Sequence, residues 1–219
     1  MKKGLSLSLK LLFKTFLMGI LVSVLLELVF LKFTKFLNIE VNFDVEIFWV
    51  ILVASFLTYI FSKKNIVNHL FINGCSRKRI STIRILSCII YDVLFFLLFV
   101  LYEIFYEDLI SNITDTGTII NLAVVYFSIN FVSEISTFLN LIYKSISIKK
   151  GKGINKTFYR YIYSFAFIAL AYSYRFIYPN IQKYYNDIVS IVVLVVVFVL
   201  QVLLAYINSR LILKVDIRA

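Results

Sequence analysis

The chain has 219 residues, of which 61% are hydrophobic, and it carries a formal net charge of +11 at pH 7. Soluble domains are about half apolar or less, so this composition excludes an ordinary soluble domain and predicts a membrane protein. The basic residues are divided among several short segments rather than gathered on one face, which argues against a nucleic-acid partner.

Six apolar runs predict six transmembrane helices, and therefore an all-α, polytopic membrane protein with a single transmembrane domain over residues 1–219. A helix needs roughly 20 apolar residues to cross the hydrocarbon core, and in lipid the backbone must pair within the helix. The predicted spans are 15–37, 47–62, 83–105, 118–143, 158–178 and 187–209. The second run is short, so we expect it to rely on flanking residues or to thin the bilayer locally.

The distribution of charge predicts the orientation of these spans. The start "MKKGLSLSLKLLFK" has a basic flank, but the apolar run after it is too long for a signal peptide, so we interpret it as a retained first span. A cytoplasmic N-terminus places most of the 23 Lys and Arg residues inside, with Arg84 counted among them, and leaves acidic outer loops. This bias predicts that both termini are cytoplasmic. The composition is typical of an AT-rich bacterial genome, so we expect a bacterial inner or plasma membrane.

The sequence lacks the catalytic motifs that are easiest to recognise. The chain has no G-x-x-x-x-G-K-[ST] phosphate loop and no H-E-x-x-H motif, and its one histidine, His69, has no metal-ligand spacing around it. The Glu residues within the spans are isolated in the sequence. We therefore expect that the chain is not an enzyme and that it binds no metal or cofactor itself.

Polar residues inside the first and third spans are candidates for a substrate path or gate. Glu27 lies near the middle of the first span, on one helical face with Gly19, Ser23 and Thr34, and Asp92 lies in the inner half of the third. An ionisable group in lipid costs at least a few kcal/mol, so these faces should meet other helices or a wet cavity. For Glu27 a substrate path and an interhelical hydrogen bond both remain open.

The fourth span carries the longest polar stripe. Its members are Asn130, Ser133, Glu134, Thr137 and Asn140. We interpret the stripe mainly as a packing surface, including one between subunits, and keep Glu134 as a further candidate for the substrate path or gate.

The inner loop 63–82 has its own pattern, "KKNIVNHLFINGCSRKRI". Ile66, Leu70 and Phe71 fall on one apolar face, which predicts a short amphipathic helix. Gly74 suits the left-handed stop after a helix, and Ser76 suits the N-cap of the next helix. One interpretation is a helix that lies on the membrane surface, with its basic residues near anionic lipid.

A second interpretation comes from the residues that follow this short helix. They are Asn73, Gly74, Cys75, Ser76, Arg77 and Lys78. A helix followed by such a segment, between the second and third of six spans, resembles the permease subunits of type-2 ATP-binding-cassette (ABC) exporters. The resemblance implies that loop 63–82 holds a coupling helix, which docks on a separate ATPase subunit. The residues that it assigns to coupling are Ile66, Leu70, Phe71, Gly74, Ser76, Arg77 and Lys78, with Leu70 and Phe71 as anchors.

The resemblance also implies an assembly of two permeases, identical or related, and two ATPases, with ATP and Mg bound by the ATPases. On this basis we expect an exporter of a hydrophobic or amphipathic substrate, such as a peptide. The alternative is a non-transporting immunity or scaffold protein, which needs the spans but not the docking helix.

Overall fold

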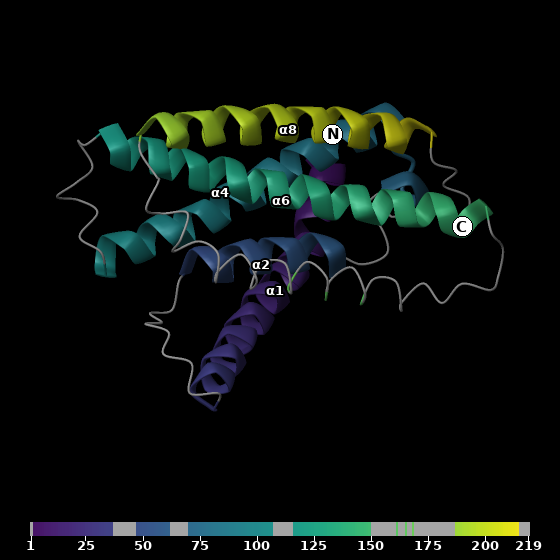
Figure 1. Cartoon of the computed structure of the whole chain (residues 1–219). Helices are drawn as coiled ribbons and strands as arrows, with labels where there is room; N and C mark the ends of the chain where they lie inside the picture. Colours follow the sequence, from purple (N-terminus) through teal and green to yellow (C-terminus); the bar gives the residue numbers. More distant parts are fainter. Residues whose placement is uncertain are drawn as a thin grey trace.

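The computed structural model describes residues 2–36, 47–61, 70–106, 116–149, 161, 165, 168 and 187–214. Its long helices are α1 (Lys2–Phe36), α2 (Ile47–Phe61), α4 (Arg77–Tyr106), α6 (Thr116–Lys149) and α8 (Asp187–Lys214). The described ranges contain no strand, so the predicted all-α class is confirmed there. Figure 1 shows α2, α4, α6 and α8 running along a common direction, while α1 runs steeply across them.

Four of these helices are long and apolar enough to cross a membrane. The segments are Lys3–Phe30, Arg77–Phe105, Thr116–Ile142 and Ile188–Lys214. They indicate a membrane protein. The predicted span 158–178 lies outside the described residues except for Tyr161, Phe165 and Ile168, which are helical.

Four of the five helices, all except α2, are longer than the apolar runs that predicted them. α1 begins at Lys2 rather than at residue 15, and α4 begins at Arg77 rather than at residue 83. α6 continues to Lys149 and α8 to Lys214. Lys and Arg are good helix formers whose long stems keep the charge away from apolar surface, so helices continue past the apolar segment.

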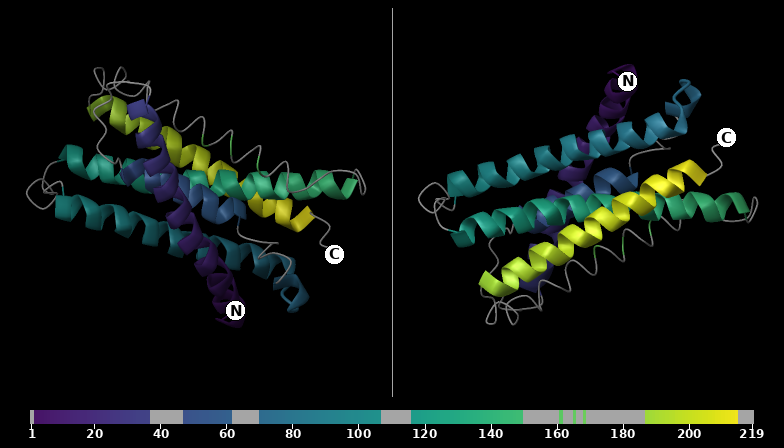
Figure 2. Two further views of the ribbon diagram at one scale, coloured as in Figure 1. Left: turned by 90° about the horizontal axis from the view of Figure 1, so that it is seen from below. Right: turned by 90° about the horizontal axis from the view of Figure 1, so that it is seen from above.

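Side-chain contacts give the direction of each helix. On α4 and α6, Arg84 meets Glu134 and Phe96 meets Tyr126, so these two helices are antiparallel. On α6 and α8, Phe127 meets Phe198 edge-on and the Glu134 carbonyl accepts a hydrogen bond from Asn208, so these two are parallel. The end of α6 and the start of α8 therefore lie at opposite ends of the bundle, as both views in Figure 2 show.

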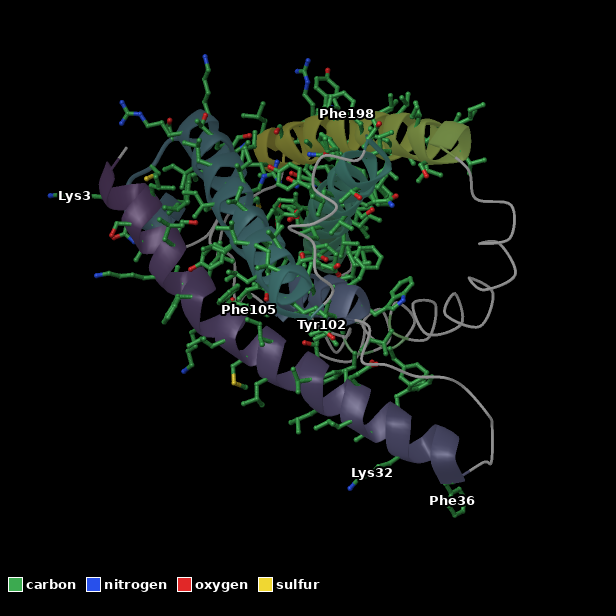
Figure 3. The ribbon with its side chains drawn as sticks, turned by 90° about the vertical axis from the view of Figure 1, so that its left-hand side faces the viewer. Lys3, Lys32, Phe36, Tyr102, Phe105 and Phe198 are labelled. Atoms are coloured by element: carbon green, nitrogen blue, oxygen red, sulfur yellow. The ribbon has the colours of Figure 1, made fainter. Side chains whose placement is uncertain are left out.

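α1 contacts α4 through its first half. The Ser8 hydroxyl donates to Ser87 on α4 at 2.9 Å, and the Tyr91 hydroxyl of α4 donates to the Leu9 carbonyl at 2.7 Å. Figure 3 shows Lys3 and Phe36 at opposite ends of α1, with the part around Lys32 and Phe36 extending away from the other described helices. Only the first half of α1 is thus held by α4.

The shortest helix, α2, is the centre of the described structure. Every residue from Val50 to Ile60 is buried. Its apolar side chains form one core with Phe95 and Phe99 of α4 and Ile129 and Val132 of α6. Because protein rather than lipid surrounds α2, its shortness does not require the predicted local thinning of the bilayer.

The other helices bury one face and expose an apolar one. On α8 nearly the whole apolar length is exposed, including Val192, Val196, Val199 and Leu203. α1 and α4 expose similar faces, with Leu17, Leu21, Leu94 and Leu101 among their members. Exposed apolar faces on several long helices are the surface expected against lipid tails.

Candidate functional site

One end of the bundle, here called the basic end, gathers the start of α1, the start of α4 and the ends of α6 and α8. A buried cluster marks it, formed by Leu70, Ile80, Ile83, Leu141 and Ile212. The exposed basic side chains of these helix ends are Lys3, Lys10, Lys78, Arg79, Arg210 and Lys214. This is the arrangement that the predicted inner charge bias requires.

At this end a short helical stretch, Leu70 to Ile72, stops at a glycine. Gly74 has φ 76°, a left-handed conformation that glycine adopts without a Cβ penalty. The Gly74 N–H donates to the Phe71 carbonyl at 2.9 Å and the Cys75 N–H donates to the Leu70 carbonyl at 3.0 Å. These two bonds are the Schellman pattern that ends a helix, so the predicted glycine stop is confirmed.

α4 restarts directly after this turn. The Ser76 carbonyl accepts the first helical bond from the Ile80 N–H at 2.9 Å, and the Ser76 Oγ accepts from the Arg79 N–H at 3.5 Å. Ser76 is therefore the N-cap that the sequence predicts. Local hydrogen bonds thus fix the end of the stretch before Gly74 and the start of α4 after it.

Leu70 does not project toward a partner. Its side chain is completely buried in the cluster at the basic end, where Ile83 of α4, Leu141 of α6 and Ile212 of α8 also lie. This burial argues against the predicted anchoring of Leu70 in an ATPase subunit. An apolar face on a short helix can pack either on a partner or on the core of its own chain, and the sequence pattern is the same in both cases. Here Leu70 packs on the core of its own chain.

Phe71 and Ile72 are the apolar side chains that the stretch exposes. Phe71 is 42% exposed and Ile72 is 73% exposed. They follow Leu70 directly, so the helical turn directs them away from the face that Leu70 buries. Ile66, the remaining apolar residue predicted for coupling, lies outside the described residues.

Arg77 joins two helix ends. Its Nη1 donates to the Leu213 carbonyl at 2.7 Å, which satisfies a carbonyl in the last turn of α8. Lys78 is exposed beside it. Arg77, which the resemblance assigns to coupling, thus holds the start of α4 against the end of α8.

A buried ion pair lies deeper in the bundle, between α4 and α6. Arg84 Nη1 donates to Glu134 Oε1 at 3.1 Å and to Oε2 at 2.9 Å. Asn208 of α8 donates to the Glu134 carbonyl at 2.9 Å and also to its carboxylate. Glu134, although isolated in the sequence, therefore has polar partners from two other helices, and Arg84 is a buried part of α4.

Asp92 is held where α2, α4 and α6 meet. Tyr59 of α2 donates to Asp92 Oδ1 at 3.0 Å, and Ser133 of α6 donates to Oδ2 at 2.9 Å. Asp92 is 1% exposed. Ser133 and Glu134 are adjacent on α6, so Asp92 and the Arg84–Glu134 pair belong to one buried polar network.

The rest of the fourth-span stripe also bonds within the chain. Asn140 donates to the Tyr59 carbonyl at the end of α2 at 2.7 Å. Asn130 and Thr137 donate to carbonyls of α6 itself. The predicted packing role therefore holds within the chain, and these bonds do not need a second subunit.

The polar face predicted on α1 is buried. Gly19, Ser23 and Glu27 all lie inside, with Glu27 at 2% exposure, while the side chain of Thr34 is outside the described set. Ser23 donates to the Ile20 carbonyl at 2.9 Å. A Cβ on Gly19 would lie 2.8 Å from the Ala54 carbonyl oxygen, so α1 and α2 approach closely there.

Sequence reasoning missed three members of the network: Tyr59, Arg84 and Asn208. Each is a polar residue within or beside an apolar run, which is the signal that could have singled them out. In the described ranges no three His, Cys, Asp or Glu side chains are grouped to hold a metal ion. Comparisons with protein families, with curated proteins and with solved structures find no match to this chain.

Proposed function

We propose that the chain is the membrane-spanning permease subunit of an ABC exporter and that a separate ATPase subunit drives it. The observation that carries the proposal is the short stretch at the basic end, which exposes Phe71 and Ile72 while Leu70 is locked in the core. Large apolar side chains on a fixed support are the residues that usually dominate a protein interface. The ATPase subunit would bind the ATP and Mg.

The proposed docking point is connected to the transmembrane helices. Leu70 lies in the cluster to which α4, α6 and α8 all contribute, and the hydrogen-bonded turn at Gly74 connects the stretch directly to the start of α4. A force on Phe71 therefore reaches three helices at once. In this proposal, motion of the ATPases rocks these helices, and substrate moves along the seam with a second, identical or related permease.

Six spans with cytoplasmic termini are part of the proposal. α6 and α8 start at the same end of the bundle. Because successive spans cross the membrane in opposite directions, the chain needs one more crossing between these two helices. Residues 158–178 have the length and composition for that crossing. The exposed lysines and arginines of the basic end favour the cytoplasmic side of a bacterial inner or plasma membrane for this end.

A hydrophobic or amphipathic substrate, such as a peptide, fits the apolar faces of α1, α4 and α8. The carboxyl groups of Asp92 and Glu134 bond within the subunit, which argues against a place on the substrate path for both. Glu27 stays a candidate for the substrate path or gate. Glu27→Gln keeps the shape and removes the charge, so lost transport with normal expression supports that role, whereas lost expression supports packing.

The test is association with the cognate ATPase subunit. The double variant Phe71→Asp, Ile72→Asp should lose pull-down of the ATPase and its stimulated hydrolysis in nanodiscs, while insertion and folding persist. Phe105→Asp is the control, because Phe105 is also exposed, at 77%, but lies at the other end of α4. Undiminished association of the double variant would remove the basis of the proposal.

The second candidate is a non-transporting immunity or scaffold protein in the membrane. The internally bonded network of Arg84, Asp92 and Glu134 favours it, since such a network stabilises one packing of the helices. Purification from the native membrane separates the two candidates. An ATPase subunit that copurifies supports the exporter, and its absence together with a bound toxin supports the second candidate.

A further inference from the structure

The buried polar network of α2, α4, α6 and α8 is unbalanced in charge. It contains two carboxyl groups, on Asp92 and Glu134, and the guanidinium of Arg84, which is already paired with Glu134. An ionised Asp92 would therefore carry a negative charge that no described cation compensates. Such a charge inside a membrane span is costly, and the usual solution is to neutralise it.

The hydroxyl groups around Asp92 accommodate an added proton without moving. The Tyr59 hydroxyl lies 3.0 Å from Asp92 Oδ1 and 3.2 Å from the Cys88 carbonyl. The Ser133 hydroxyl lies 2.9 Å from Asp92 Oδ2 and 2.9 Å from the Asn130 carbonyl. Each hydroxyl has one proton and two acceptors within reach.

These geometries allow two hydrogen-bonding patterns with the same positions of the heavy atoms. When Asp92 is ionised, both hydroxyls donate to its carboxylate. When Asp92 is protonated, its O–H donates to one of the hydroxyls, and that hydroxyl donates to the neighbouring backbone carbonyl instead. The second pattern satisfies every group and leaves no net charge on Asp92.

A second observation concerns the basic-end side of the network. Arg84 Nε and Nη2 and Asn208 Oδ1 are buried and have no hydrogen-bond partner in the described part of the chain. Buried groups of this kind are commonly satisfied by internal water. Arg84, Cys88 and Asp92 are four residues apart and share one face of α4, so water beside Arg84 lies on the same side of the helix as Asp92.

We propose that Asp92 is a proton-binding site inside the bundle and that it holds its proton while α2 and α6 are packed against α4. The proton comes from water at the basic end and converts the carboxylate of Asp92 to a carboxylic acid. When the helices separate, Tyr59 and Ser133 leave the carboxyl, water takes their place, and the proton returns to that water. The described titratable groups around the site are Tyr59 on α2, Arg84, Cys88 and Tyr91 on α4 and Glu134 on α6.

A proton fits this site better than a metal cation does. One carboxyl and two hydroxyl groups at hydrogen-bonding distance provide few oxygen ligands, whereas cations such as Ca²⁺ take six or more. The hydroxyl protons also point at the carboxyl in the ionised pattern, where a cation would need lone pairs.

Infrared spectroscopy of the full-length protein in nanodiscs tests the site directly. The difference spectrum between wild type and Asp92→Asn at pH 7 should contain the C=O band of a protonated carboxylic acid, which shifts in D₂O. Ser133→Ala keeps the carboxyl and removes one hydrogen bond, so it should move this band rather than abolish it. It also serves if Asp92→Asn does not fold. A wild-type spectrum with only carboxylate bands from Asp92, or a band that sodium removes at fixed pH, would overturn the proposal.

Thermal unfolding gives an independent measurement. An amide resembles a neutral carboxylic acid, so Asp92→Asn should shift Tm by no more than about 2 °C at pH 7. Glu134→Gln should lower Tm by several times that amount, because it removes the counter-charge of Arg84. An equal loss in both variants would mean that the charge of Asp92 is needed, which contradicts the proposal.

Discussion

Arg84 of α4 and Glu134 of α6 form an ion pair within the apolar bundle, with Nη1 2.9 Å from Oε2 and side-chain exposures of 5% and 8%. The pair occurs near the basic end, and Asn208 extends it to α8. Three helices, α4, α6 and α8, are therefore joined by one carboxylate. A buried pair of this kind contributes little net stability while it is intact. Removal of one partner is strongly destabilising, because the other charge stays buried without a counter-charge.

The first prediction concerns this pair. Glu134→Gln should destabilise the protein by about 3–5 kcal/mol, because it leaves Arg84 without its counter-charge. Reversible unfolding in mixed micelles measures the loss. The double variant Arg84→Met, Glu134→Leu is the control, and it should recover most of the stability since neither charge remains. If the double variant is as unstable as Glu134→Gln, the pair is not the cause.

The second prediction separates Leu70 from Phe71, its neighbour in the same short stretch. Leu70→Ala should lower stability by about 2–5 kcal/mol, because it opens a cavity in the cluster at the basic end. Phe71→Ala should change stability by no more than about 0.5 kcal/mol, because Phe71 is exposed. Unfolding curves of both variants in the same micelles decide this. Equal losses would contradict the burial described for Leu70.

The third prediction rests on the backbone of Gly74. With φ 76°, Gly74→Ala should cost about 1–2 kcal/mol, although nothing lies within 4 Å of an added Cβ. Gly74→Asn should cost less, because asparagine adopts the left-handed conformation more readily. The two unfolding free energies are compared directly. A larger loss for Asn than for Ala would exclude backbone strain as the cause.

The fourth prediction concerns the close approach of α1 to α2. A Cβ on Gly19 would lie 2.5 Å from Thr58 Oγ1 and 2.8 Å from the Ala54 carbonyl oxygen, and the backbone cannot yield without moving a helix. Gly19→Ala should therefore destabilise by about 1–3 kcal/mol. Leu21→Ala, at an exposed position on the same helix, is the control and should change stability little. Equal losses of stability in Gly19→Ala and Leu21→Ala would contradict the close approach of α1 and α2 at Gly19.

The fifth prediction concerns topology. Single cysteines in a background that lacks Cys75 and Cys88 should react differently with a membrane-impermeant reagent in intact cells. Lys3→Cys and Lys214→Cys, at the basic end, should be protected, whereas Thr116→Cys, at the opposite end, should be labelled. Labelling after permeabilisation confirms that the protected positions are reactive. External labelling of Lys214→Cys would reverse the proposed orientation.

Local features were the ones predictable from the sequence. The stop at Gly74 and the cap at Ser76 depend on residues within one turn of each other, and both occur as predicted. The helices were predictable because long apolar runs in lipid must satisfy their own backbone. Their ends were less predictable, since Lys and Arg continue a helix beyond the apolar run, as at Lys2 and Arg77.

By itself the sequence determined an all-α membrane protein with a polar stripe on α6, a polar face on α1 and a capped turn at the basic end. Only the tertiary structure decided that Leu70 is buried while Phe71 is exposed, that α2 is surrounded by protein, and that Glu134 pairs with Arg84. The physical reason is that helical periodicity specifies which residues share a face but not what covers that face. The covering residues come from other helices, 74 positions away for Asn208 and Glu134 and 136 for Arg77 and Leu213, and packing alone brings them together.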